Sequence, residues 1–453
     1  MQVVDPSTGE KGERYETLSA DDVDSKLQLA EGSYEQWRQT PLSHRAELLR
    51  RVAEDLRAQK HDFAELMARE MGKPRAQGEG EAEKCAWVCE YYAEHAEAFL
   101  APEPIETDAS ESYVSYRPLG PIFAIMPWNF PFWQVFRHAA PGLMAGNAIV
   151  LKHAENVPGC ALALEQIFRD AGFLEGLFTT LLIDREAASR VIADRRIRGV
   201  TLTGSTEAGR AVASQAGEHL KKVVLELGGS DPYVVLEDAD LDETVAVCAK
   251  SRLLNSGQSC IAAKRFIVVE PLRARFEERL VEEMKAATMG HPLEDGTDVG
   301  PQARADLRDE LHRQVRQSVA KGARVALGGE PAAGPGFFYP PSVLTGVRKG
   351  MPAFDEEVFG PVAAVIGADD EEQAIALAND TPYGLGAAVF TEDREKGRAI
   401  AEHRLEAGCC FVNGLVKSDP RLPFGGVGES GYGRELARHG IREFVNAKTV
   451  WLA

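Results

Sequence analysis

The chain has 453 residues, 44% of them hydrophobic, so it can bury substantial cores and its length suits two or three domains. Seventy acidic residues against 51 basic residues give a net charge of −19, which argues against nucleic acid or an anionic membrane as a partner. These values predict an ordinary soluble globular protein.

The cysteines and the N-terminus predict a reducing, cytoplasmic location. The seven cysteines stand at positions 85, 89, 160, 248, 260, 409 and 410 and form no repeating disulfide framework. Cys85 and Cys89 are helically spaced but lack a nearby His or a second Cys pair, so no metal site is predicted. The N-terminus is polar and charged, and no apolar run approaches the roughly eighteen residues that would span a membrane.

Residues 20–100 are predicted to be mostly helical. Arg, Glu and Ala separate apolar positions at helical spacing, such as Leu48, Leu49, Val52 and Leu56. We expect these helices to lie on the surface and to cover a sheet.

From about residue 119 the pattern changes to short apolar runs separated by helical stretches. The first series comprises Ile122–Met126, Ala148–Leu151, Thr179–Ile183, Val200–Leu202 and Val223–Leu225. The second comprises Tyr233–Leu236, Phe266–Val269, Val325–Leu327, Val362–Ile366, Ala387–Phe390 and Phe411–Val412. Apolar strands that alternate with helices predict parallel, doubly wound sheets, and two series predict two α/β domains.

The segment Val200–Thr203 followed by Gly204 and Ser205 predicts a strand, a tight turn and a helix. That geometry directs backbone N–H groups and a helix N-terminus at an anion. It is not the usual Gly-x-Gly-x-x-Gly fingerprint, so the segment taken alone favours an ordinary helix capped by Ser205 or Thr206 over a dinucleotide site.

Two residues predict covalent chemistry. Cys260 follows Gly257-Gln258-Ser259, whose small residues leave a thiol open to a ligand, and the thiolate is the reactive form. Glu226 precedes Gly228-Gly229, where the backbone can turn sharply, so its carboxylate could take a proton or activate water. Taken alone, a single Cys is more often a small core residue than a catalyst.

Other motifs accompany this pair in a fixed order. They are Pro127-Trp128-Asn129-Phe130-Pro131, Gly204-Ser205-Thr206-Glu207-Ala208-Gly209-Arg210, Glu356-Glu357-Val358-Phe359-Gly360-Pro361 and Pro423-Phe424-Gly425-Gly426-Val427-Gly428-Glu429-Ser430-Gly431. Together with the Glu226 and Cys260 segments they resemble the aldehyde dehydrogenase superfamily over nearly the whole chain. Lys417-Ser418-Asp419-Pro420-Arg421-Leu422-Pro423, with Trp133 and Arg137, narrows the resemblance to bacterial succinate-semialdehyde dehydrogenases.

The resemblance implies an architecture and an assembly. It places a variant Rossmann cofactor-binding domain at residues 1–103 and 120–228 and a catalytic domain at 229–432. A small β oligomerisation element would comprise residues 104–119 and 433–453, because Ser112–Tyr116 and the C-terminal strand form such a flap in the family. A homodimer or homotetramer is therefore expected.

The resemblance also implies a nicotinamide cofactor. Gly204, Ser205 and Gly209 would hold the pyrophosphate, and Lys152 and Glu155 would face the adenosine ribose at the end of a strand. Glu155 would accept hydrogen bonds from the ribose hydroxyls and repel a 2′-phosphate, which favours NAD, whereas Lys152 keeps NADP open. The remaining expected cofactor contacts are Pro127, Trp128, Leu227, Glu357 and Phe359; Glu357 as a loop carboxylate and Phe359 as a core residue are the alternatives.

The implied reaction is the oxidation of an aldehyde to an acid. Cys260 would add to the aldehyde carbon, and the Asn129 amide with the Cys260 N–H would stabilise the oxyanion. Hydride transfer then leaves a thioester, and Glu226 would activate the water that hydrolyses it.

The expected substrate is a semialdehyde. Trp133 and Arg137 are one helical step apart, and Asn129 lies four residues earlier, so the three share a cavity if the segment is helical. The Arg137 guanidinium suits a carboxylate, with Ser418 as a second contact. The alternative for Arg137 is a salt bridge on a helix surface, and Phe424 and Phe132 either line the tunnel or fill the core.

Other activities stay open at this point. The substrate could be another small aliphatic or semialdehyde compound. A non-redox thioester hydrolase or an amidase would also use a Cys and a Glu, but it would not need Gly204, Lys152 or Glu357. A dehydrogenase that transfers the acyl group to coenzyme A would not need Glu226. A binding protein on the same fold would be expected to lose Cys260, Glu226 or Asn129.

Overall fold

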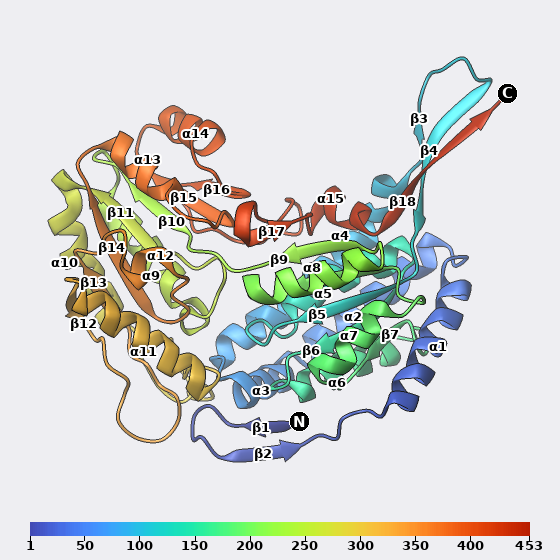
Figure 1. Ribbon diagram of the computed structural model, residues 1–453, viewed down its shortest axis with the longest axis horizontal. Helices are drawn as coiled ribbons and strands as arrows, with labels where there is room; N and C mark the ends of the chain where they lie inside the picture. The colour runs from blue at the N-terminus through green and yellow to red at the C-terminus, as the bar shows by residue number, and fades with distance from the viewer.

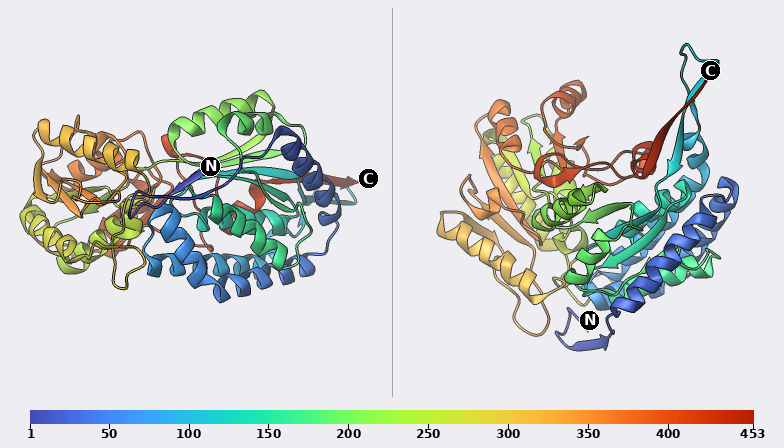
Figure 2. Two further views of the ribbon diagram at one scale, coloured as in Figure 1. Left: turned by 90° about the horizontal axis from the view of Figure 1, so that it is seen from below. Right: turned by 45° about the vertical axis from the view of Figure 1, so that its right-hand side comes forward.

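The computed structural model describes residues 1–453 as two α/β lobes and a projecting arm (Figure 1). One lobe is built on a six-stranded sheet and the other on a seven-stranded sheet, as the doubly wound prediction required. Figure 2 shows the arm, a three-stranded antiparallel sheet, extending beyond both lobes. No helix combines the length and the apolar character needed to cross a membrane.

The six-stranded sheet has the order β17-β9-β8-β5-β6-β7 and is parallel except at β17. Its strands are β5 (Pro121–Met126), β6 (Ala148–His153), β7 (Phe178–Thr180), β8 (Gly199–Thr203), β9 (Lys222–Glu226) and β17 (Gly431–Tyr432), the last preceded by the short helix η2 (Gly428–Ser430). An N-terminal hairpin of β1 (Gln2–Val4) and β2 (Lys11–Arg14) lies apart from this sheet.

Helices cover both faces of this sheet because alternate strand residues enter two different cores. Ile122 and Ala124 pack in one core with α2 (Leu42–Ala58), α3 (Lys60–Met71), α4 (Arg75–Leu100), α5 (Trp133–Ala145) and α6 (Pro158–Asp170). Phe123 packs in the other core with α7 (Arg185–Ala193), α8 (Thr206–Glu218) and part of α1 (Ala20–Trp37). The helices predicted for residues 20–100 are thus confirmed as α1 to α4.

The seven-stranded sheet has the order β12-β13-β14-β11-β10-β15-β16. Its strands are β10 (Pro232–Val235), β11 (Arg265–Val269), β12 (Arg324–Leu327), β13 (Ser342–Thr345), β14 (Val362–Ala368), β15 (Gly386–Phe390) and β16 (Cys409–Val412). One face packs on α9 (Leu241–Leu253) and α10 (Glu270–Ala286), and the other packs on α11 (Ala305–Ala320), α12 (Pro352–Asp355), α13 (Glu371–Asn379) and α14 (Arg394–His403).

The arm consists of β3 (Glu103–Pro104), β4 (Glu111–Pro118) and β18 (Val445–Leu452), with α15 (Ala437–Glu443) just before β18. β4 and β18 pair antiparallel along their full lengths, from Glu111 opposite Leu452 to Pro118 opposite Val445. The predicted pairing of the segment around Ser112–Tyr116 with the C-terminal strand is therefore confirmed.

The predicted and the observed strands differ at β7 and at β13, among other places. The expected strand Thr179–Ile183 ends at Thr180, because Leu181 and Ile183 lie in a connecting segment that is buried against the core. Burial alone explains their apolar character. β13 was not predicted, since its four residues begin with Ser and end with Thr and show no continuous apolar run.

Candidate active site

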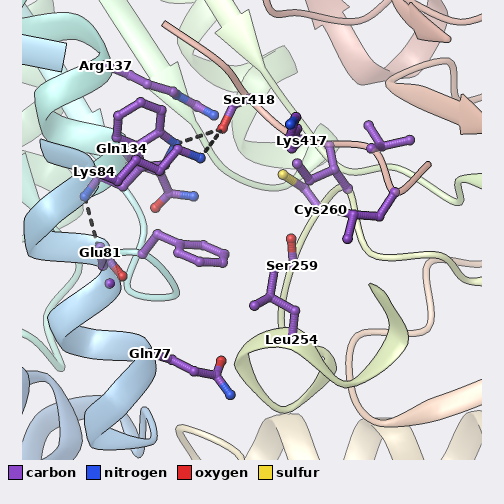
Figure 3. A pocket seen from close by; sticks show the side chains of 16 residues that line it. Gln77, Glu81, Lys84, Gln134, Arg137, Leu254, Ser259, Cys260, Lys417 and Ser418 are labelled. Carbon is purple, nitrogen blue, oxygen red and sulfur yellow. Dashed lines mark hydrogen bonds between the residues drawn. The ribbon is translucent and has the colours of Figure 1, made fainter. Parts of the chain in front are cut away.

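A cavity of about 260 Å³ lies beside Cys260 (Figure 3). Four segments from both lobes line it: the N-terminal half of α4, the start of α5, the loop that carries Cys260, and residues 415–418. Figure 3 shows the Cys260 thiol across the cavity from the α4 and α5 side chains. Of the predicted site residues, Cys260, Trp133, Arg137 and Ser418 line this cavity.

The loop before Cys260 has an unusual backbone. The short helix η1 (Leu254–Gly257) contains Asn255 and Ser256 at φ values of 54° and 56°, and Gly257 follows at 74°. Such left-handed conformations strain residues other than glycine and recur at functional sites. At Gly257 a Cβ atom would lie 2.2 Å from the Gly360 carbonyl, so only glycine fits there.

Buried polar groups hold this loop in place. The Asn255 side chain donates to the Asn129 carbonyl at 2.7 Å and to the Gln258 carbonyl at 3.0 Å. The Lys264 ammonium donates to the carbonyls of Ser259 at 3.0 Å and Cys260 at 2.6 Å. The backbone of Cys260 is thus held in place, while its side chain makes no hydrogen bond.

The Cys260 thiol lies in an environment that opposes ionisation. Burial raises its pKa to about 12, although the positive charges of Arg137 and Lys264 act in the opposite direction. The neutral thiol is therefore the favoured form, and any attack by this sulfur would require the loss of its proton.

Glu226 is the last residue of β9, and its carboxyl group is isolated. The side chain is 2% exposed, and neither carboxyl oxygen has a hydrogen-bond partner. Burial, reinforced by the negative charge of Glu435, raises its pKa well above the ordinary value. Glu226 does not line the cavity that Cys260 lines. Burial thus disfavours the carboxylate form, which is the form that a base requires.

Asn129 lies next to the nucleophile loop, but not on helix α5. Its Nδ2 donates to the Gln258 carbonyl at 3.0 Å, which leaves the second amide hydrogen for another acceptor. The expectation that Asn129, Trp133 and Arg137 share one helix is wrong, because α5 begins at Trp133. The backbone of Asn129 instead turns toward the Cys260 loop.

Arg137 is buried and ion-paired. Its Nε lies 2.5 Å from a Glu435 carboxylate oxygen, and its guanidinium lies 4.7 Å from the centre of the Phe424 ring. The alternative of a salt bridge on a helix surface is therefore wrong, because both partners are buried. Phe424 and Phe132 are core residues and do not line this cavity.

Most of the predicted cofactor residues lie at or near the ends of β5, β6, β8 and β9 in one lobe. Glu357 and Phe359 come from the other lobe, between α12 and β14. Ser205 caps α8 by accepting from the Ala208 N–H at 3.2 Å, and at Gly209 a Cβ atom would lie 2.5 Å from Leu227.

Glu357 accepts from the Gly229 N–H at 3.1 Å, and Trp128 meets Phe359 edge-on with ring centroids 5.8 Å apart. Pro127 directly follows β5, next to Trp128.

One observation tests whether these residues fit a nicotinamide dinucleotide. The buried Lys152 ammonium donates only to the His153 carbonyl, at 3.2 Å, and no carboxylate lies within ion-pair distance of it. Burial lowers its pKa. An anionic or hydroxyl-rich ligand at the end of β6 would supply the missing partner, so the site suits the cofactor.

Sequence reasoning missed several residues of the site. Glu81, Lys84 and Gln77 of α4 line the cavity, and Lys264 and Glu435 hold the Cys260 loop and Arg137. None of them belongs to a recognised motif. Nothing local to α4 indicated that a distant loop closes over it.

A family model described as the aldehyde dehydrogenase family matches residues 1–450. The chain belongs to the aldehyde dehydrogenase family. It is an NAD(P)-dependent aldehyde dehydrogenase, and the resemblance found in the sequence motifs is confirmed.

Individual relatives agree with this assignment. A "probable succinate-semialdehyde dehydrogenase", NADP(+), of Synechocystis sp. is 50% identical over 453 residues and covers 100% of both chains. A succinate semialdehyde dehydrogenase, NAD(P)+, of Escherichia coli is 49% identical over 99% of this chain and 97% of its own. The crystal structure of succinic semialdehyde dehydrogenase from Streptococcus pyogenes with NADP+ superposes with a TM-score of 0.97 at 38% identity, covering 100% and 99% of the two chains.

Proposed function

We propose that this aldehyde dehydrogenase oxidises succinate semialdehyde to succinate, with NADP as its main cofactor and NAD as a second one. The observation that carries the substrate is the positively charged cavity beside Cys260, which Lys84, Arg137 and Ser418 line. An aldehyde with a carboxylate at its far end complements that lining. Relatives with this named activity support the same substrate.

The first chemical step belongs to Cys260. Its sulfur forms a bond to the aldehyde carbon, the carbonyl oxygen becomes an alkoxide, and the thiol proton passes to solvent water. The free Nδ2 hydrogen of Asn129 and the Cys260 backbone N–H are the donors we assign to that alkoxide, and each such donor is typically worth about 3–4 kcal/mol in the transition state.

Bound NAD(P) supplies the acceptor for the hydride that leaves the tetrahedral carbon. Lys152, Glu155, Ser205, Glu357 and Phe359 are the residues we assign to holding it. The product of that step is a thioester on Cys260.

Glu226 is the base we assign to the second half of the reaction. Its ionised carboxylate takes a proton from water, the water oxygen bonds to the thioester carbon, and the carbon–sulfur bond breaks. Succinate leaves and the Cys260 sulfur is regenerated. The raised pKa of Glu226 makes this base stronger when it is ionised, at the cost of a smaller ionised fraction.

The sequence-based preference for NAD rested on repulsion between Glu155 and a 2′-phosphate. Glu155 is exposed to solvent, which screens that repulsion, while Lys152 is a buried positive charge nearby. The relatives' names include NADP in each case. We therefore place NADP ahead of NAD.

We also propose a cytoplasmic homodimer or homotetramer. The cytoplasmic location is supported by the seven cysteines, all of which are unpaired. Assembly through the arm is supported by its exposed hydrophobic residues Ile105, Trp451 and Leu452.

The test of the proposed reaction is reduction of NADP and NAD, followed by absorbance, with succinate semialdehyde, acetaldehyde and a long-chain aldehyde. Wild type should reduce NADP fastest with succinate semialdehyde, and Cys260→Ala should abolish the reaction. Thioester hydrolysis without any cofactor reduction would instead identify a hydrolase. Faster turnover of the neutral aldehydes would overturn the assigned substrate.

A further inference from the structure

Lys84 is a half-buried cation in the cavity wall, and it has no counter-ion (Figure 3). It extends from α4, where its ammonium donates to the Ser418 hydroxyl oxygen at 3.0 Å and lies 4.2 Å from the centre of the Trp133 ring. No carboxylate lies within ion-pair distance of Lys84. The nearest acidic side chain on its own helix face, Glu81, is already bound by Lys73 and by the N–H groups of Phe132 and Trp133.

Ser418 has a hydroxyl proton with no acceptor in the protein. Its oxygen accepts from the Trp133 indole N–H at 2.8 Å and from the Lys84 ammonium, as the converging dashed lines in Figure 3 show. These two donors occupy both lone pairs of the oxygen. The remaining O–H group and the remaining ammonium hydrogens are therefore available to a ligand in the cavity.

The charges around the cavity make Lys84 the strongest attraction for an anion. Arg137 faces the same cavity, but Glu435 neutralises it at 2.5 Å. Lys417 lines the opposite wall and is exposed to water, which screens its charge. Burial lowers the pKa of Lys84 to about 8, with Arg137 acting in the same direction and Cys85, Glu81 and Asp419 opposing it. Near neutral pH the group is still mainly protonated.

We propose that Lys84, together with the Ser418 hydroxyl, binds the terminal carboxylate of the semialdehyde across the cavity from Cys260. This inference rests on the proposed function and deepens it, because it assigns substrate selection to a residue of α4. Trp133 orients both groups: its ring faces the ammonium, and its indole N–H holds the Ser418 oxygen.

The test compares succinate semialdehyde with butanal, a neutral aldehyde of the same chain length, in Lys84→Met, Lys84→Arg and Lys417→Met. We expect Lys84→Met to lower kcat/KM for the semialdehyde about 10- to 100-fold, mainly through KM, and to change kcat/KM for butanal less than about threefold. Lys84→Arg should recover part of the loss, because it keeps the charge. An equal loss with both aldehydes, or an equal loss of preference in Lys417→Met, would overturn the inference.

Succinate binding, measured by calorimetry, distinguishes a failure of this inference from a failure of the proposed function. Succinate should bind wild type and bind Lys84→Met about 10- to 100-fold more weakly. If wild type does not oxidise the semialdehyde but still binds succinate through Lys84, the proposed reaction fails and the carboxylate site stands. If Lys84→Met binds succinate as well as wild type does, the carboxylate site fails whatever the reaction.

Discussion

At the scale of single residues, the site combines two groups whose charged forms are disfavoured by burial. Burial raises the pKa of the Cys260 thiol and of the Glu226 carboxyl group, so neither is ionised by its surroundings alone. The positive charges nearest to Cys260, Arg137 and Lys264, are themselves engaged with Glu435 and Glu357. Ionisation at this site therefore depends on pH and on what the cavity holds.

The reactivity of Cys260 toward iodoacetamide should follow its thiolate fraction. Because its pKa of about 12 lies above the accessible range, the alkylation rate of the free enzyme should rise about tenfold per pH unit between about pH 6 and about pH 9. Mass spectrometry of the peptide that contains Cys260 measures this rate, with Cys260→Ala as the blank. A rate independent of pH would mean that the thiol is already ionised.

Glu226→Gln should trap the acylated enzyme. Removing the base leaves the first half of the reaction in place, so one equivalent of cofactor is reduced and the acyl group stays on Cys260. Steady-state turnover should fall about a hundred- to ten-thousand-fold. Intact-protein mass spectrometry after mixing with aldehyde and NADP detects the adduct; its absence would remove Glu226 from the hydrolysis step.

At the scale of elements, a buried ion pair connects α3, α4 and α5. Glu81 on α4 accepts from the N–H groups of Phe132 and Trp133, both at 2.9 Å, at the start of α5, where N–H groups lack partners within the helix. Lys73, in the turn between α3 and α4, neutralises the same carboxylate, and both side chains are almost fully buried. This contact sets the position of Trp133 and, one turn later, of Arg137.

Glu81→Gln should destabilise the protein much more than Glu83→Gln on the same helix. The first change leaves Lys73 buried without its counter-ion and should lower the free energy of unfolding by about 3–5 kcal/mol. Glu83 is exposed and pairs with Arg57 at the surface, so its loss should cost no more than about 1 kcal/mol. Urea denaturation followed by far-ultraviolet circular dichroism compares the two variants. Similar losses in the free energy of unfolding would mean that the buried pair stabilises the protein no more than the surface pair does.

At the scale of the whole molecule, two lobes meet around one site, and the arm projects away from both of them (Figure 2). The cavity takes α4 and α5 from one lobe and the Cys260 loop from the other, so the lobes must keep their relative position for catalysis. The arm buries little of itself: Trp451 is 53% exposed and Ile105 is 50% exposed. An extended β ribbon with such residues suits contact with a second copy of the chain.

Deleting residues 445–453 should therefore lower the number of subunits in the assembly. We expect wild type to have the mass of a dimer or a tetramer in light scattering coupled to size exclusion, and the shortened chain to elute as a smaller species. Trp451→Asp should weaken the same association without removing β18. An unchanged mass in both variants would place the interface elsewhere.

Local patterns predict much of the fold. Where both faces of a sheet are buried, its strands appear in the sequence as continuous apolar runs between helical stretches. The limits are visible at Thr179–Ile183, where an apolar run continues past the end of β7, and at β13, whose short polar-ended strand shows no such run. An apolar segment indicates that its side chains are buried. A buried loop and a buried strand are equally apolar, so composition alone does not distinguish them.

For the site, the amino-acid order was sufficient to predict roles for Cys260, Glu226, Asn129 and the cofactor turn, because each stands in a short motif and the motifs follow one another in the order that the resemblance requires. The pairing of Arg137 with Glu435 and the contact of Lys84 with Ser418 were decided only by tertiary structure. In each pair the two residues lie hundreds of positions apart in the sequence. Only the folded chain brings them within a few ångströms of each other, and only there does burial reduce the screening of the Arg137 and Glu435 charges by water.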